Sequence, residues 1–140
     1  TSFDLNDLTV SRTGATATTI TSTTCIPVAA GDFGLFARSD VAANNGGLDG
    51  VDAIYNFTLV DSGVNRNLSI LDGATVLDTV AYTSSASSAD GKSIQLDPDN
   101  FTTTANDAFD PTAGIICQGT APYGVEGNLG TPGAANAQCP

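Results

Sequence analysis

Alternating apolar and polar residues predict short β-strands over most of this 140-residue chain. The clearest run covers residues 53–60, where Tyr55, Phe57 and Leu59 fall on one face of an extended chain with polar residues between them. No segment shows the apolar period of a convincing helix. Further extended segments are expected at residues 93–96, around Phe33, Leu35 and Ala37, and near Ile20 and Ile26.

Two runs, residues 67–71 and 75–83, flank the turn pair Asp72-Gly73 and predict a β-hairpin. Many short strands separated by Gly and Asp turns are typical of a sandwich or barrel. The length suits one domain, and a hydrophobic fraction of 41% is enough to build a core. We therefore expect a single all-β domain over residues 1–140, in which the Gly/Pro-rich residues 98–140 form an irregular tail.

The three cysteines indicate a secreted protein with one internal disulfide and one remaining thiol. Cys117 and Cys139 bracket the tail, which has little else to hold it, so we predict that they are linked. Closing such a loop contributes about 3 kcal/mol in the chain-entropy model. Cys25 has three interpretations: a buried small hydrophobic side chain, a bridge to a segment outside this sequence, or an intermolecular bridge.

The chain is strongly acidic, with 15 Asp and Glu against 4 Lys and Arg and a net charge of -11. This charge repels nucleic-acid phosphates and anionic membrane surfaces, so neither is expected as a partner. Only 14% of the residues are charged, which leaves solubility to hydroxyl and amide groups and indicates an extracellular or cell-surface protein. No stretch approaches the roughly 18 apolar residues of a membrane span.

The sequence contains no His, and this excludes His-based catalytic triads, Cys-His dyads and His-ligated zinc or haem. A glycosidase needs two carboxylates about 5–9.5 Å apart across a cleft. A domain this small, with three Tyr, six Phe and no Trp, is a poor host for such a cleft. We expect no enzymatic activity.

Two acidic loops are candidates for Ca²⁺, which takes oxygen ligands at irregular spacing. Neither loop matches the EF-hand pattern, and solvated loop acids are the alternative interpretation. The favoured set is Asp97, Asp99, Asn100, Asp107 and Asp110; the second is Asp40, Asn44, Asn45, Asp49 and Asp52.

Asp78 is expected to point inward, because it shares a strand phase with Val76, Val80 and Tyr82. A buried carboxylate must be hydrogen-bonded or paired, so its favoured role is structural, holding the hairpin to a loop. A metal or catalytic role is the less favoured alternative. The candidate partners are Lys92, Arg38 and the backbone amides of a loop.

Asn56, Asn67 and Asn100 head N-x-[ST] sequons for N-glycosylation. Threonine-rich and serine-rich runs at residues 16–24, 83–88 and 102–104 have the hydroxyl density of O-glycan acceptors. The alternative is that these threonines are β-prone residues on wet strands and loops, and that the sequons arise by chance.

Seven segments carry a family resemblance: SFDLNDLTV at Ser2, IPVAAGDFGLFAR at Ile26, NGGLDGVD at Asn45, YNFTL at Tyr55, LDGATVLDTVAY at Leu71, GKSIQLDP at Gly91 and GTPGAAN at Gly130. In this order, and spanning nearly the whole chain, they resemble the bacterial lamin tail domain family. The resemblance implies an immunoglobulin-like β-sandwich on secreted or surface proteins, often an accessory module, with no catalytic residues to carry over.

The sequence departs from that family in two ways. Leu8 and Ile115-Ile116 stand where the family usually has Trp, which changes the core filling. The family domain also begins with one or two strands ahead of the segment that matches Ser2, and this sequence lacks them. A sandwich without those strands is expected to have an open edge and an apolar groove. The residues expected to line that groove are Leu5, Val10, Phe33 and Leu35.

Two functional hypotheses follow from this incomplete sandwich. The first is a self-associating structural module, a surface filament subunit assembled by strand addition between copies or with a neighbouring domain. Residues 16–24 and the tail ending at Cys139-Pro140 are the candidate donor segments. The alternative is a monomeric binding module of a larger secreted protein, holding a glycan, a cell-surface polymer or a partner domain.

Overall fold

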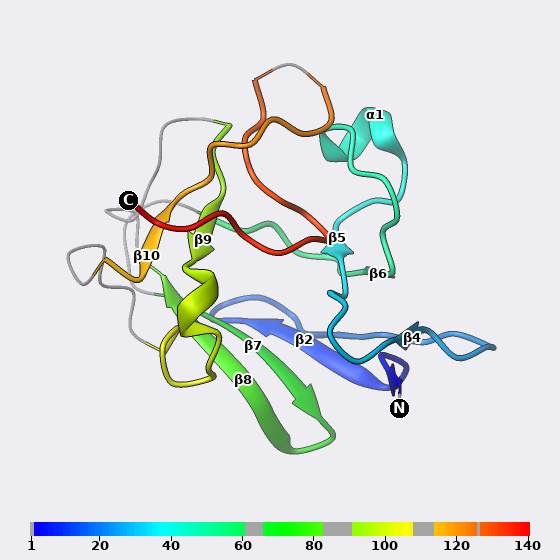
Figure 1. The fold of residues 1–140 in the computed structure, drawn as a ribbon. Helices are drawn as coiled ribbons and strands as arrows, with labels where there is room; N and C mark the ends of the chain where they lie inside the picture. Colours follow the sequence, from blue (N-terminus) through cyan, green and yellow to red (C-terminus); the bar gives the residue numbers. More distant parts are fainter. Residues whose placement is uncertain (1, 61–65, 83–90, 108–113, 126) are drawn as a thin grey trace.

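The computed structural model describes residues 2–60, 66–82, 91–107, 114–125 and 127–140, and they form an all-β fold (Figure 1). The largest element is a four-stranded antiparallel sheet in the order β3-β2-β7-β8. Its strands are β2 (Leu8–Arg12), β3 (Thr18–Thr19), β7 (Arg66–Asp72) and β8 (Thr75–Tyr82). Because β8 is last in this order, it forms one edge of the sheet.

Three smaller pairs of strands complete the sheet structure of the described residues. Strand β1 (Phe3–Asp4) pairs with β4 (Pro27–Val28), and β9 (Ile94–Leu96) pairs with β10 (Ile116–Gln118), both antiparallel. Strand β5 (Phe36–Ala37) pairs in parallel with β6 (Ala53–Ile54). The described helical elements are two short segments, α1 (Ala42–Asn45) and the 3-10 helix η2 (Pro98–Asn100).

The predicted hairpin is strands β7 and β8, which project from the body of the molecule in Figure 1. Asp72 pairs with Thr75, so the turn residues are Gly73 and Ala74 rather than Asp72 and Gly73. Gly73 has φ 55°, the conformation in which glycine is favoured at the first position of a two-residue hairpin loop. The hairpin prediction is confirmed, with its turn moved by one residue.

A bulge changes which side chains of β8 face inward. Ile70 pairs with Asp78 and Leu71 with Val76, so Leu77 is an extra residue without a partner on β7. The strict alternation expected for β8 therefore breaks at Leu77. Val76, expected to face the core, is 55% exposed.

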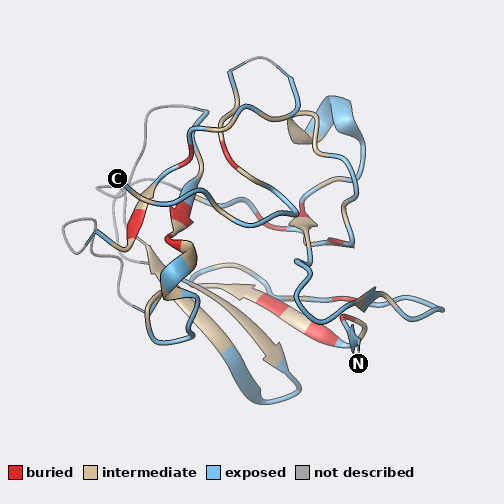
Figure 2. Ribbon diagram, in the orientation of Figure 1, coloured by how far each residue is buried: buried red, intermediate tan, exposed pale blue. Residues whose placement is uncertain are grey.

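The core is small and lies between the four-stranded sheet and the β5–β6 pair (Figure 2). Its buried members are Val10, Ile20, Ala53 and Phe57. Residues 53–60 were expected to form one strand, but only Ala53 and Ile54 pair with a neighbour. Phe57 is nevertheless buried, with its ring 4.7 Å from that of Tyr55, because packing and not a strand ladder holds this segment.

The end of the C-terminal tail is tied to β10 by a disulfide and to β9 by polar side chains. Cys117 and Cys139 form the predicted disulfide, with their Cα atoms 5.7 Å apart. Gln95 donates from Nε2 to the carbonyl of Ala137 at 2.8 Å, and Asn136 donates from Nδ2 to the carbonyl of Leu96 at 2.7 Å. The tail is therefore less irregular than expected, and it also contains strand β10.

Candidate functional site

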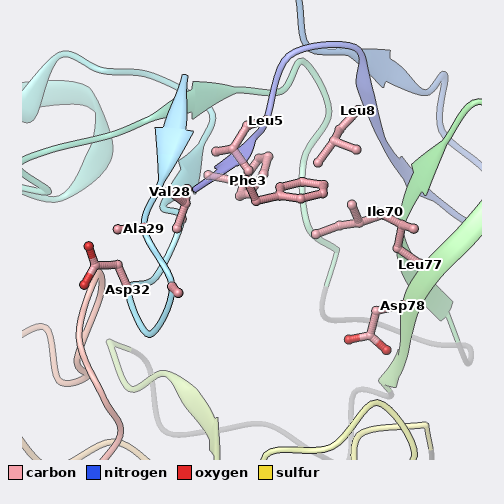
Figure 3. A pocket seen from close by; sticks show the side chains of 12 residues that line it. Phe3, Leu5, Leu8, Val28, Ala29, Asp32, Ile70, Leu77 and Asp78 are labelled. Carbon is pink, nitrogen blue, oxygen red and sulfur yellow. The ribbon is translucent and has the colours of Figure 1, made fainter. Parts of the chain in front are cut away.

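An apolar groove of about 570 Å³ lies between the β1–β4 pair and one end of the four-stranded sheet. Figure 3 shows the ring of Phe3 reaching across it toward Ile70, with Leu5 and Leu8 on the β1–β2 side. The groove opens next to the β7–β8 hairpin. Its full lining is Phe3, Leu5, Leu8, Val28, Ala29, Ala30, Asp32, Gly34, Phe36, Ile70, Leu77 and Asp78.

The Asp4 carboxylate positions the β1 side of the groove. Its Oδ1 accepts the backbone N–H groups of Asn6 at 3.0 Å and Ile26 at 2.8 Å, and Leu5 donates its own N–H to the Ile26 carbonyl at 3.0 Å. The amide of Asn6 and then that of Ile26 lower the pKa of Asp4, because both favour the charged carboxylate. This clamp holds the 52%-exposed Phe3 over the groove.

Strand β8 supplies the opposite wall and an open edge. No described strand pairs with the side of β8 that faces away from β7. Val76 is 55% exposed and Leu77 41% exposed, and Leu77 also lines the groove. An apolar edge strand beside an apolar groove is the arrangement that accepts an added strand.

Two carboxylates, Asp32 and Asp78, stand on opposite walls of the groove in Figure 3. Asp78 accepts the Asn106 side-chain amide on Oδ2 at 2.8 Å and the backbone N–H of Thr79 on Oδ1 at 2.9 Å. Asp32 is exposed. The groove is thus apolar along its length and acidic at one end.

The expectations for Asp78 need two corrections. The side chain is half-buried rather than buried, because the bulge at Leu77 turns it toward the groove. Its hydrogen-bond partner from a loop is the Asn106 side chain, not Lys92, Arg38 or a loop backbone amide. Nothing in the local pattern around Asn106 marks it as a partner, since the contact joins residues 28 positions apart.

Three of the four residues expected to line the groove lie elsewhere. Leu5 lines it, as predicted, but Val10 is buried in the core, two residues further along β2 than the groove residue Leu8. Phe33 packs edge-on against Phe101, with ring centroids 6.1 Å apart. Leu35 and Phe33 instead line a separate, polar hollow of about 570 Å³.

Among the described residues, the acidic members of the favoured calcium set are not grouped as three side chains that could hold a metal ion. Asp97 is only 4% exposed, and its oxygens face N–H donors: the backbone of Cys139 at 2.8 Å and of Asp99 at 2.9 Å, and the Gln138 side chain at 3.2 Å. The Cys139 amide is the largest cause of its lowered pKa, and burial acts in the opposite direction. Asp110 lies outside the described residues, and Asp107 is exposed.

The second acidic loop is held by internal hydrogen bonds. Asn45 donates to the carbonyls of Ser39 and Leu48, and Asp52 accepts the Leu35 amide at 2.8 Å. Asp49 and Asp52, with Asp32, line the polar hollow, while Asp40 and Asn44 are exposed and do not. Within the described ranges, no three acidic or Cys side chains are grouped as a metal site. Calcium binding stays a prediction.

The sequon asparagines differ in exposure. Asn56 and Asn67 are exposed, whereas Asn100 is half-buried and donates from Nδ2 to Asp97 at 3.4 Å. Asn56 Oδ1 accepts the Thr18 hydroxyl at 2.6 Å. Residues 83–88, one of the runs predicted to accept O-glycans, lie outside the described residues. Glycosylation stays a prediction.

Cys25 is exposed and free, so its interpretation as a buried hydrophobic side chain is wrong. A hydrogen bond to Asp4 and the charge of that carboxylate raise the pKa of the Cys25 thiol. A bridge to a segment outside this sequence and an intermolecular bridge both stay predictions.

The described part of the chain contains no helix of the length and apolarity needed to cross a bilayer. Comparison of the whole sequence with family models, and of the chain with curated proteins and solved structures, found no match.

Proposed function

We propose that this chain is a non-catalytic extracellular interaction module that accepts an extended segment of another chain along the β8 edge and the apolar groove. The observation that carries this proposal is the exposure of Val76 and Leu77 on an edge that no described strand covers. A segment added beside β8 satisfies backbone hydrogen-bonding groups and removes Leu77 from water.

The groove also indicates the chemistry of that segment. Side chains of a strand alternate between two faces, so every second residue of the segment would enter the groove beside Phe3 and Leu77. Those residues should be apolar. Asp32 and Asp78 at the acidic end favour a Lys or Arg on the same segment, because opposite charges set the orientation of a bound chain.

We further propose that the fold is an immunoglobulin-like sandwich of the lamin-tail type. The four-stranded antiparallel sheet and the core packed on its inner face support this assignment, together with the ordered set of family-like segments. The groove adjoins β1, the first strand of the described chain, which is where strands ahead of Ser2 would be added in that family.

The two predicted donor segments, residues 16–24 and the C-terminal tail, are both bonded within their own chain, which does not favour a filament formed by donating them to a neighbour. Within residues 16–24, Thr18 and Thr19 pair with β2, and the tail is bonded to β9 and Asp97. The open edge of β8 supports self-association as a second candidate function, because the β8 strands of two copies of the chain can pair directly. A surface filament subunit is one form of that candidate.

The test is binding of an eight-residue fluorescent peptide with Val at alternate positions and a terminal Arg, measured by anisotropy. We expect Leu77→Lys to weaken binding about tenfold or more, because a buried unpaired charge is costly. Val41→Lys is the matched control, since Val41 is 52% exposed and does not line the groove. Equal binding by both variants, or no binding to the unmodified chain, would overturn the proposal.

A further inference from the structure

The backbone of β8 points some of its hydrogen-bonding groups at β7 and the others at the open edge. The N–H and C=O of one residue in an antiparallel strand lie on the same side, and successive residues alternate between the two sides. Asn67 accepts the N–H of Thr13, the residue after β2, on its carbonyl at 3.0 Å, so Asn67 faces β2 and Leu68 faces β8. Leu68 pairs with Val80, which therefore faces β7. The N–H of Thr79 consequently points toward the open edge.

The Asp78 carboxylate caps this edge amide. Its Oδ1 accepts the Thr79 N–H at 2.9 Å, while the Thr79 hydroxyl lies 2.8 Å from the Ser69 hydroxyl on β7. The Thr79 side chain is thus bonded to the neighbouring strand, whereas its backbone N–H turns to the edge. An edge N–H that already has an acceptor is not free to bond to an incoming strand. The cap therefore closes β8 at this position.

The carboxylate is held in place from a second side. Asp78 Oδ2 accepts the Asn106 side-chain amide at 2.8 Å, and Asp78 lines the groove next to Leu77. Both donors are neutral amides, so neither neutralises the negative charge. The side chain is half-buried, and a half-buried charge gains more from a cationic partner than an exposed one does. One carboxylate thus stands between the edge, the groove and the loop that carries Asn106.

Strand addition at this position requires an exchange of partners. The carbonyl of an incoming residue can take the Thr79 N–H only if Asp78 Oδ1 leaves it. A neutral segment would leave that oxygen half-buried without its donor, which is costly. A segment with Arg or Lys on the groove face gives the carboxylate a charged donor, and such hydrogen bonds are roughly twice as strong as neutral ones. The exchange therefore favours a basic segment.

We propose that Asp78 is a cap that closes the β8 edge in the free chain and yields it to a segment carrying a basic side chain opposite Asp78. The proposal rests on the strand-addition function and adds a specificity-determining residue to it. Directly opposite residues of paired strands place their side chains on the same face, so the basic residue enters the groove beside the apolar ones. The partner is therefore an extended segment of alternate apolar residues interrupted by one Arg or Lys.

Amide hydrogen exchange of the full chain, without any peptide, tests the cap. We expect Asp78→Ala to speed exchange of the Thr79 amide about tenfold or more, the loss typical of a hydrogen bond to a charged group. Asp78→Asn should keep this amide protected, since its side-chain oxygen still accepts and the Asn106 amide can turn over to meet its NH2 group. Asp40→Ala is the matched control, because Asp40 is exposed and does not line the groove. Equal Thr79 exchange in Asp78→Ala and Asp40→Ala would show that there is no cap.

Binding of two fluorescent peptides, measured by anisotropy, tests the specificity. Both have eight residues with Val at alternate positions, and a central Val is replaced by Arg in one and by Gln in the other. We expect the unmodified chain to prefer the Arg peptide about tenfold or more, Asp78→Asn to lose that preference, and Asp40→Asn to keep it. Asp78→Ala, which has no cap to displace, should bind the Gln peptide more tightly than the unmodified chain does. A preference for Arg that survives in Asp78→Asn would overturn the proposal.

The two measurements separate this proposal from the function on which it rests. If neither peptide binds to any variant, strand addition at β8 is wrong, and slow exchange of Thr79 then identifies a cap that only protects the edge. If both peptides bind equally to the unmodified chain, strand addition stands and the specificity role of Asp78 is wrong. If Asp78→Ala fails to fold, Asp78→Asn still decides the specificity, because it retains acceptors and donors for both hydrogen bonds.

Discussion

The backbone N–H of Cys139 donates to Oδ2 of Asp97 at 2.8 Å, across 42 positions of sequence. Asp97 also caps the first turn of η2 by accepting the Asp99 amide on Oδ1 at 2.9 Å. One buried carboxylate therefore joins the end of β9 to the end of the chain. The Cys117–Cys139 disulfide is one attachment of the tail, and the hydrogen bond from Cys139 to Asp97 is a second, polar one.

Replacement of Asp97 should release the tail. Asp97→Asn places an amide donor against the N–H groups of Cys139 and Asp99, and we expect the Tm to fall by on the order of 5 °C. Hydrogen exchange of the Cys139 amide should speed up, while exchange in the β7–β8 hairpin should not change. Asp99→Asn is the control because Asp99 is exposed and its carboxylate accepts, among the described residues, only from the Gln138 side chain. Equal effects of the two variants would contradict this role.

Acid should destabilise the fold through Asp97 and Asp4. The native pKa of each lies below the ordinary value of 3.8, because backbone amides favour the charged form. As the pH falls toward 3.8, the unfolded chain therefore binds more protons than the folded chain does. The stability that the two charged carboxylates contribute is present above pH 3.8, and it is lost below that pH as each carboxylate protonates in the folded chain. Thermal unfolding from pH 7 to pH 2 should show this loss, and Asp97→Asn should reduce it. An unchanged Tm across that range would refute the prediction.

Removal of the disulfide should destabilise the fold by about 3 kcal/mol, because the unfolded chain regains the conformational entropy that a crosslink across a loop of this length removes. The comparison is Cys117→Ser/Cys139→Ser against Cys25→Ser, since Cys25 is exposed and unbonded. Denaturant unfolding measures the difference. Peptide mapping under non-reducing conditions should recover Cys117 linked to Cys139, and a link that includes Cys25 would show that the pairing is wrong.

Gly124 should tolerate a side chain less well than Gly133. Both have positive φ, 60° and 71°, where an L side chain costs roughly 1–2 kcal/mol. A Cβ on Gly124 would also collide with the backbone carbonyls of Gly46 and Gly47, whereas nothing lies within 4 Å of one on Gly133. Gly124→Ala should therefore be less stable than Gly133→Ala by about 1–3 kcal/mol in denaturant unfolding. Equal losses would mean that the Gly46–Gly124 approach is not tight in solution.

Light scattering over a range of concentrations tests self-association at the β8 edge. If copies pair there, the mean mass of the unmodified chain should rise with concentration, and Val76→Lys should hold the chain as a monomer. Ile54→Lys is the control, because Ile54 is 45% exposed and lies on β6. A monomer with a cooperative melt at all concentrations would exclude the filament form of the second candidate function.

Local patterns predicted those elements whose stability is local. The β7–β8 hairpin follows from two alternating runs and one glycine with positive φ, and the tail disulfide follows from two cysteines that bracket a Gly/Pro-rich segment. Residues 53–60 show the limit of this reasoning. Their alternation is equally clear, but only Ala53 and Ile54 find a strand partner, because pairing depends on where a distant neighbour lies.

The sequence by itself determined the all-β class, the hairpin and the acidic, hydroxyl-rich character of the chain. Tertiary structure alone decided the rest: that Asp97 receives the Cys139 amide, that Asn106 meets Asp78, and that Arg12 and Arg66 share one carbonyl, that of Thr13. Each of these arrangements brings together residues that are far apart in sequence. Alternation reports which face of a strand is apolar, but a hydrogen bond forms only where folding brings a particular donor to a particular acceptor.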